Sequence, residues 1–437
     1  MKRQWWKPGV FSSVVLMITL LAPLGVAAQP PESEELPPAG MERVPGQYIV
    51  VLRDDTPDVG RAAAEIAQRV GGAVGHTYSA AVKGFVIRIP AGVEPARLRG
   101  DRRVQFVEQD GIAQAFDHVA SEIPTGINRI NAELNATTAA GTGWGVAVID
   151  TGIQLDHPDL NVVGNVSFVK GTKSGKDDDG HGTHVAGTVG AKDNGTGVVG
   201  VTPSVDLYAV KVLNKNGMGF WSDVIKGIDW VTQHASTIAV ANMSLGGPGS
   251  DDGNCGNTNG DAVHKAICGS VANGIVYAVA AGNSTADATN YRPASYDEVI
   301  TVSALADSDG QPNGTGPATS YGADDTFATF SNFGADVDEI APGVSIRSTY
   351  IGSSYRTFSG TSMAAPHVSG AIALWIARNG RPSTGNATDP TVRQIIAESS
   401  ESVVSFKGDP DGIAEPMVNA DTAFVGGTGS SICCPAP

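Results

Sequence analysis

Short, uninterrupted apolar runs recur along the chain after residue 117 and alternate with stretches of helical pattern. Runs of this length with few polar positions are typical of parallel strands that are covered on both faces. The predicted strands lie at 145–149, 207–211, 238–242, 275–280 and 299–302. The predicted helices lie at 182–189, 222–233, 261–273, 362–379 and 391–399. The pattern therefore predicts an α/β fold with a doubly wound, mostly parallel sheet of about 300 residues.

A smaller domain is predicted before this sheet, over residues 47–116. Its elements are expected in the order β-α-β-β-α-β. Three of the strands are assigned to 48–52, 83–89 and 104–108, and the helices to 59–70 and 94–99. This order predicts a small ferredoxin-like α+β domain. We interpret residues 29–46, rich in proline and glutamate, as a linker. The main domain is then assigned to 117–425 and a C-terminal tail to 426–437.

The first 28 residues have the pattern of an export signal. Basic residues precede an apolar stretch at 10–26, and small residues follow it, which predicts cleavage after Ala28. A membrane anchor is the alternative interpretation. The stretch is interrupted by Pro23 and Gly25, and it is short for a membrane-spanning helix. We therefore expect a secreted, extracellular protein without a membrane segment.

The composition is strongly acidic, with a formal net charge of −16 at pH 7. A surface of this sign repels phosphate backbones and anionic lipids, so neither nucleic acid nor a membrane is expected as a partner. The same surface is compatible with binding cations such as calcium. We expect the protein to be a monomer.

The chain contains four cysteines, all in its C-terminal two thirds. Cys255 and Cys268 bracket a polar loop, and export to an oxidising compartment favours a disulfide between them. Cys433 and Cys434 are adjacent near the C-terminus. They could pair with each other, with another chain, or with the first two cysteines.

Three motifs place a carboxylate, an imidazole and a hydroxyl at the ends of predicted elements. VAVIDTG puts Asp150 at the end of a buried strand, and DDDGHGTHVAGTVG puts His181 at the start of a helix. SGTSMAAPHVSG puts Ser362 where a glycine-flanked turn enters a helix. In open parallel sheets, active sites form at the carboxyl ends of strands and at helix N-termini. We therefore expect the three side chains to converge.

These residue types suit acyl transfer. A serine hydroxyl is a weak nucleophile until a base takes its proton, and histidine titrates near neutrality. A buried aspartate fixes the tautomer of the imidazole and stabilises the imidazolium that forms. The helix N-terminus at Ser362 also presents backbone N–H groups to a developing oxyanion.

The three motifs resemble those of the subtilisin superfamily, in the same order, from about Pro124 to Phe424. The resemblance implies a serine endopeptidase that hydrolyses peptide bonds through an acyl-enzyme intermediate. It makes Asn283, in AVAAGNS, the side-chain donor to the oxyanion, and loss of one such donor typically costs about 3–4 kcal/mol. It also implies that the substrate pairs with NMSLGG as an added strand. The implied substrate-binding residues are Ser244, Leu245, Gly246, Gly247, Ala280, Ala281 and Gly282.

Each of these residues taken singly has a more ordinary interpretation. Asp150 could be a turn residue, Ser362 a helix N-cap, and His181 with His184 a metal pair, although no third ligand motif is apparent. Two other classes of function are a catalytically silent binding module and an esterase on another α/β fold. The complete set of catalytic residue types, including Asn283, argues against the binding module. No G-x-S-x-G motif surrounds Ser362, which argues against the esterase.

Residues 47–116 resemble the inhibitory propeptide of the same family. The ending VQFVEQDGIAQAF resembles a terminus that lies in the active-site cleft as a product, which implies self-cleavage after Phe116. A cut nearer Ala120 is the alternative, because PTGINRI resembles a mature start. With Phe116 in the main pocket, we expect a preference for aromatic or large apolar residues on the acyl side. The implied partners are protein or peptide substrates and the chain's own propeptide.

The resemblance also implies two structural calcium sites and no organic cofactor. Calcium takes carboxylate and carbonyl oxygens. The ligands implied for site one are Asp159, Asn194 and the carbonyls of Lys192, Thr196 and Val198. The ligands implied for site two are Asp338 and the carbonyls of Ala294, Tyr296 and Val299. Ser121 stands where the family has a glutamine ligand for site one, and the alternative is that both loops fold without metal.

Overall fold

The computed structural model describes residues 43–115, 124–132, 142–401 and 406–421. The predicted signal, most of the linker, the C-terminal tail and the predicted cleavage positions Ala28 and Phe116 lie outside these residues. Within the described part of the chain, no helix combines the length and the hydropathy needed to cross a bilayer.

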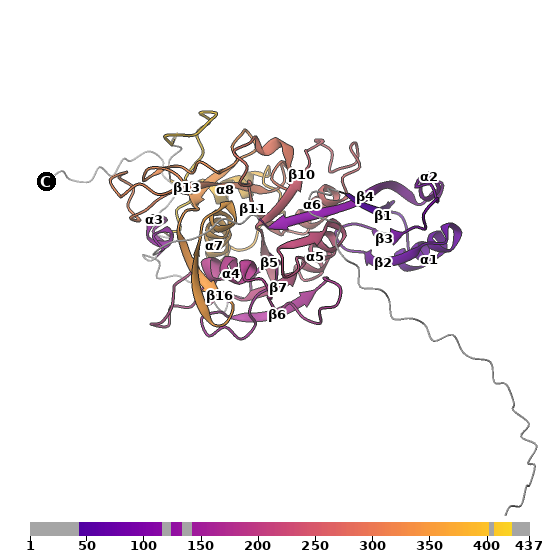
Figure 1. Ribbon diagram of the computed structural model, residues 1–437, viewed down its shortest axis with the longest axis horizontal. Coiled ribbons are helices and arrows are strands. Elements are labelled where there is room, and N and C mark those ends of the chain that lie inside the picture. The colour runs from indigo at the N-terminus through magenta and orange to yellow at the C-terminus, as the bar shows by residue number, and fades with distance from the viewer. Residues whose placement is uncertain (1–42, 116–123, 133–141, 402–405, 422–437) are drawn as a thin grey trace, which may run out of the picture. The chain divides into compact units, whose positions relative to one another are not determined.

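Residues 43–115 form a four-stranded antiparallel sheet covered by two helices (Figure 1). The strands lie in the order β4-β1-β3-β2, and every neighbouring pair is antiparallel. The elements are β1 (Arg43–Leu52), α1 (Val59–Val70), β2 (Ala73–Tyr78), β3 (Gly84–Arg88), α2 (Ala96–Arg99) and β4 (Val104–Ala115). The Asp58 carboxylate caps α1 by accepting from the Arg61 N–H, and Gly71 ends it at φ +69°.

The larger part of the chain is built on a mostly parallel sheet, as predicted. Its strands lie in the order β14-β13-β11-β9-β5-β7-β6, β15 pairs with β13, and only the β13–β14 pair is antiparallel. The bounds are β5 (Gly145–Asp150), β6 (Val162–Ser167), β7 (Leu207–Lys211), β9 (Ile238–Met243), β11 (Val276–Ala280), β13 (Ile300–Ala306), β14 (Thr326–Phe327) and β15 (Glu339–Pro342).

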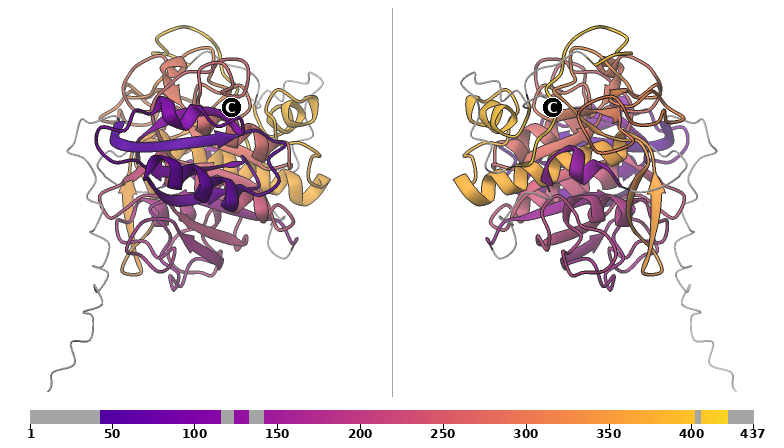
Figure 2. Two further views of the ribbon diagram at one scale, coloured as in Figure 1. Left: turned by 90° about the vertical axis from the view of Figure 1, so that its right-hand side faces the viewer. Right: turned by 90° about the vertical axis from the view of Figure 1, so that its left-hand side faces the viewer.

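Alternate residues of the central strands, such as β5 and β11, serve two separate cores, one on each face of this sheet. Val146 and Val148 of β5 pack with residues of α4 (His181–Gly190) and α7 (Thr361–Asn379). Ala147 and Ile149 pack with residues of α5 (Trp221–Gln233) and α6 (Ala262–Val271). Burial on both faces explains why these strands carry continuous apolar sequence. The last helix, α8 (Pro390–Glu398), lies beside α7 (Figure 2). The Glu398 carboxylate at its end accepts a 2.7 Å hydrogen bond from the indole N–H of Trp375 in α7.

Short strands and a short helix complete the described elements. They are α3 (Gly126–Arg129), β8 (Met218–Phe220), β10 (Leu245–Pro248), the 3-10 helix Ala288–Asn290, β12 (Tyr291–Arg292), β16 (Ile346–Tyr350) and β17 (Ser354–Phe358). The largest correction to a predicted bound is at β4, which was predicted to end at Glu108 and continues to Ala115. Strand β4 is longer than predicted because β8 and β10 pair with its second half. Figure 1 shows β4 reaching β10.

Candidate active site

Asp150 and His181 meet where a strand of the main sheet ends and a helix begins. Asp150 is the last residue of β5 and His181 the first of α4, and both are buried. His181 Nδ1 lies 2.8 Å from Asp150 Oδ1, which also accepts from the Thr151 N–H at 2.6 Å. A side chain at Gly182 would place its Cβ 2.2 Å from the Gly152 carbonyl oxygen, so only glycine permits this approach.

Ser362 lies in the first turn of α7, which packs with α4 on the same face of the sheet. The side chain is buried, and its Oγ lies 3.3 Å from the main-chain oxygen of Ser244. In return, Ser244 Oγ donates to the Ser362 carbonyl at 2.9 Å. These two contacts fix the start of α7 against the residue that precedes β10. The structure therefore places all three predicted catalytic residues at the carboxyl ends of the parallel strands.

Asn283, just beyond the end of β11, offers an unused hydrogen-bond donor next to Ser362. Its Oδ1 accepts from the backbone N–H and the hydroxyl of Thr361, at 2.9 and 2.8 Å. Its Nδ2 is buried and has no hydrogen-bond partner among the described residues. An unpaired buried donor is costly unless something completes it. A negative oxygen that develops on a substrate beside Ser362 would do so.

Two buried polar residues outside the predicted catalytic set hold the turns around the site. The Asp177 carboxylate accepts from the Thr151 hydroxyl at 2.9 Å and from the Gly180 N–H at 3.0 Å, linking the turn after Asp150 to the start of α4. The Lys211 ammonium donates to the Thr151 carbonyl at 2.6 Å and to Asp178 at 2.7 Å. The sequence offered one indication of this role for Asp177, namely its position shortly before a predicted helix start.

His184 does not form a metal pair with His181. Its Nε2 lies 3.0 Å from the carbonyl oxygens of Ile346 and of Arg356, whereas His181 faces Asp150. Burial, followed by the nearby His181, lowers the pKa of His184 to about 3, so this imidazole is neutral. Its contacts join α4 to the β16–β17 hairpin.

The residues implied for substrate binding line an antiparallel pairing with β4. Leu245 and Gly246 of β10 pair with Ala115 and Gln114, and Ser244 precedes them. On the other edge of β4, Ala113 pairs with Gly219 of β8. A Cβ at Gly247 would lie 3.2 Å from the Trp221 ring. Buried residues at and beyond the end of β11 make up the rest of the implied set, namely Ala280, Ala281 and Gly282.

The structure brings the side chains implied for calcium site one together, but not all in a ligating orientation. Asp159 accepts from Asn194 Nδ2 at 2.8 Å and from the Val198 N–H at 3.1 Å. The oxygen of Asn194 is turned to Thr196, and the Lys192 N–H donates to the Asp159 carbonyl. These residues fit a calcium ion once the Asn194 amide turns its oxygen toward Asp159.

The residues implied for calcium site two already have other partners. Asp338 accepts from Arg393 Nη1 at 2.7 Å and from the Thr301 N–H at 3.0 Å. The Ala294 carbonyl accepts from the Thr301 hydroxyl at 2.7 Å, and the Tyr296 carbonyl from the Val299 N–H at 3.2 Å. The guanidinium supplies the positive charge that an ion would bring, so this ligand set does not fit calcium as it stands.

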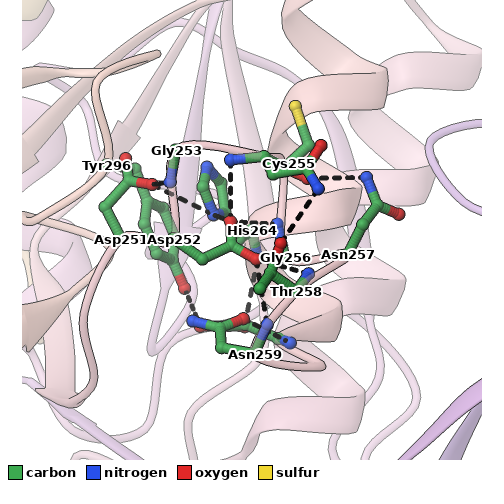
Figure 3. A network of polar contacts seen from close by, with 12 residues as sticks. Asp251, Asp252, Gly253, Cys255, Gly256, Asn257, Thr258, Asn259, His264 and Tyr296 are labelled. Carbon is green, nitrogen blue, oxygen red and sulfur yellow. Dashed lines mark hydrogen bonds and ion pairs between the residues drawn. The ribbon is translucent and has the colours of Figure 1, made fainter.

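The predicted disulfide between Cys255 and Cys268 is present, and it closes the loop that follows β10. Asp252 lies at the centre of this loop and accepts backbone N–H groups from Asn254, Gly256, Thr258 and Asn259 (Figure 3). Burial opposes the charge of Asp252, but these hydrogen bonds lower its pKa to about 2. The loop therefore has a fixed conformation next to β10.

His264 of α6 lies against the same loop and predicts a pH-dependent stability. Its Nε2 is 2.8 Å from Glu298, and its Nδ1 is 3.5 Å from Asp252 and 3.8 Å from Asp251. Burial opposes a charge on His264, but Glu298 and then Asp251 raise the net pKa above its usual value. Because the folded pKa is raised, the stabilisation is complete below about pH 6.5 and is lost as the pH rises through the folded pKa.

We therefore expect His264→Gln to lower the thermal unfolding midpoint more at about pH 5.5 than at about pH 9. Calorimetry of parent and variant at both pH values measures the difference. An equal loss at both pH values would show that His264 contributes packing alone.

The chain matches known proteins over most of its length. Residues 141–421 match the Subtilase family. Subtilisin DY from Bacillus licheniformis is 44% identical over 263 residues, which cover 59% of this chain and 86% of that protein. Subtilisin E from Bacillus subtilis (strain 168) is 39% identical over 331 residues, covering 75% and 77%. The crystal structure of a cold adapted subtilisin-like serine proteinase has a TM-score of 0.54 and 34% identity, and covers 69% of this chain and 99% of that one. The protein thus belongs to the subtilase family and is a serine endopeptidase.

Proposed function

We propose that the protein is a secreted endopeptidase in which Asp150, His181 and Ser362 form the catalytic triad. The observation that carries this proposal is the 2.8 Å contact between His181 Nδ1 and Asp150 Oδ1, at the end of the sheet where Ser362 lies in the first turn of α7. With Nδ1 held by a buried carboxylate, Nε2 is the nitrogen left to act as the base.

The reaction proceeds by acyl transfer. Ser362 Oγ attacks the scissile carbonyl as His181 takes its proton, and Asp150 stabilises the imidazolium. The Asn283 amide and the Ser362 N–H donate to the tetrahedral oxyanion. His181 then protonates the leaving amine, and the same histidine activates the water that releases the acyl group.

The substrate binds as an extra strand between β8 and β10. The support is β4 itself, which pairs with Gly246 on one edge and with Gly219 on the other. Ala280, Ala281 and Gly282 form the wall of the pocket for the residue on the acyl side of the cut. The preference for an aromatic or large apolar residue in that pocket follows from Phe116, which lies outside the described residues.

Residues 47–116 act as a ferredoxin-like inhibitory propeptide that the enzyme cuts from itself after Phe116. The element order of residues 43–115 and the place of β4 in the cleft support this proposal. Hydrogen bonds between residues 43–115 and α5 also support it, since the Asp229 carboxylate of α5 accepts from the backbone N–H groups of Ala80 and Ala81 at 2.6 and 3.1 Å. While β4 fills the cleft, a substrate cannot pair there.

One structural calcium, held by Asp159, Asn194 and nearby carbonyls, belongs to the proposal. The fit of site one supports it, and no step of the reaction uses the ion. Calcium would tie the loop after α4 to the segment that follows β5.

Incubating the mature protein with casein and with a simple ester, with and without a serine-directed inhibitor, tests the function. We expect casein to be cleaved and the inhibitor to stop the cleavage. Ester turnover without casein cleavage would favour an esterase. Absence of both activities would favour a binding module.

A further inference from the structure

Three carboxylates gather in the loop between β13 and β14, away from both calcium sites that the family resemblance implies. Asp307, Asp309 and Asp324 each place one carboxylate oxygen within 4.8 Å of the others. Oxygens that share a calcium ion at about 2.4 Å can be no more than about 4.8 Å apart. The three oxygens are therefore already close enough to share one ion.

The Asp307 carboxylate of this cluster is buried, and one of its two oxygens has no hydrogen-bond partner among the described residues. The Asp307 residue is 1% exposed, and its Oδ1 accepts from the Gly310 N–H at 2.9 Å. Its Oδ2 has no hydrogen-bond partner among the described residues. A buried carboxylate oxygen left in this state is costly, so a ligand or a proton must complete it.

The protein supplies no compensating charge at this place. Within residues 43–115, 124–132, 142–401 and 406–421, no Lys, Arg or His nitrogen lies within 4.0 Å of the Asp307, Asp309 or Asp324 carboxylates. Arg129 is paired with the neighbouring Asp325, at 2.9 Å. Three like charges in this space repel one another unless a cation joins them.

Backbone contacts fix the carboxylates before any ion binds. Asp309 accepts from the Gln311 N–H at 2.9 Å, and Asp324 accepts from the Ser308 N–H at 2.8 Å and the Gly316 N–H at 2.7 Å. A Cβ at Gly316 would lie 2.8 Å from the Asp324 carboxylate, so this approach requires glycine. A fixed set of oxygens binds an ion with little further ordering.

We propose that Asp307, Asp309 and Asp324 bind a calcium ion that joins the start of this loop to its end. The loop also contacts Thr125 and α3, because the Thr125 hydroxyl lies 3.5 Å from the Asp307 carbonyl oxygen and Arg129 of α3 pairs with Asp325. Three carboxylates favour calcium, which takes several carboxylate oxygens in varied geometry, over magnesium, which requires a near-regular octahedron and is usually held by one or two carboxylates.

Counting bound calcium in the full chain tests the proposal. Calorimetric titration is made in a Ser362→Ala background, which prevents self-digestion, with Asp307→Asn and Asp309→Asn as variants. Asparagine keeps the backbone contact of each position and removes the charge. Asp389→Asn is the matched control, because Asp389 makes the same contact to a backbone N–H two residues on, at 2.8 Å, outside the cluster. Both test variants should bind one calcium fewer than the parent, and the control should bind the parent's number.

Thermal unfolding supplies a second readout, because the shift of the unfolding midpoint of Asp307→Asn relative to the parent should differ in sign between chelator and excess calcium. In chelator, Asp307→Asn should unfold at or above the parent's midpoint, because a repelling charge is gone. In excess calcium it should unfold below the parent, because the ion is lost. Equal calcium counts in parent and test variants, or the same midpoint shift in both conditions, would overturn the proposal. Occupation of the site by magnesium alone would overturn the choice of ion.

Discussion

A Ser362→Ala variant is expected to lose about 10⁶-fold in kcat for peptide hydrolysis, the size of loss known for the equivalent change in subtilisin. Alanine removes the nucleophile but suits the start of a helix, and Ser244 can still donate to the main-chain carbonyl of position 362. The variant should therefore remain folded and remain joined to residues 43–115. Intact mass measures the joining, and a chromogenic peptide measures the rate.

Ser369→Ala is the matched control, because Ser369 lies on the same helix and is equally buried. Its hydroxyl donates to Asn242 at 2.9 Å. The control should lose stability and keep kcat within a few-fold of the parent, about the scatter expected for a residue remote from the chemistry. Self-processing by Ser362→Ala would exclude this serine as the nucleophile.

An Asp150→Asn variant is expected to lose about 10⁴-fold in kcat, with little change in KM. The amide occupies the space of the carboxylate and can still accept from the Thr151 N–H. It cannot, however, stabilise a positive imidazole at 2.8 Å. Steady-state kinetics of the mature variant, processed by immobilised parent enzyme, separate kcat from KM.

Asp177→Asn serves as the comparison for that change. Asp177 is also a buried aspartate near His181, but it acts through Thr151, Gly180 and Thr183 and holds their turns. Its loss should lower stability and reduce kcat much less than Asp150→Asn does. Equal losses for the two variants would mean that Asp150 has only a structural role.

The strands and helices of the main sheet could be predicted closely because burial on both faces leaves continuous apolar runs. The predicted strand 207–211 coincides with β7 of that sheet. In the smaller part of the chain, the predicted helix 59–70 coincides with α1. Strand β2 could not be located, because most of its residues are exposed and show no apolar alternation. The second half of β4 was missed for another reason, since β8 and β10, its partners there, lie more than a hundred residues further along the chain.

The positions of Asp150, His181 and Ser362 in the fold could be predicted because each motif lies at the end of an element that the sequence predicts. Asp177 and Lys211 could not be assigned in this way, because their partners are backbone groups of turns that exist only in the folded chain. The same holds for Arg393, whose pairing with Asp338 leaves no signal in local spacing. The composition of residues 306–326, rich in Gly, Asp, Ser and Thr, indicates a surface loop but does not show which of its carboxylates meet.

Covalent labelling of the mature enzyme tests most directly whether the Ser362 hydroxyl is made reactive by His181 and Asp150. Parent and Asp150→Asn are treated with a fluorophosphonate at neutral pH, and the adduct is located by peptide mass spectrometry. The account predicts a single adduct on Ser362 that forms at least about 100-fold more slowly in the variant. An adduct on another residue, or equal labelling rates in the two proteins, would contradict it.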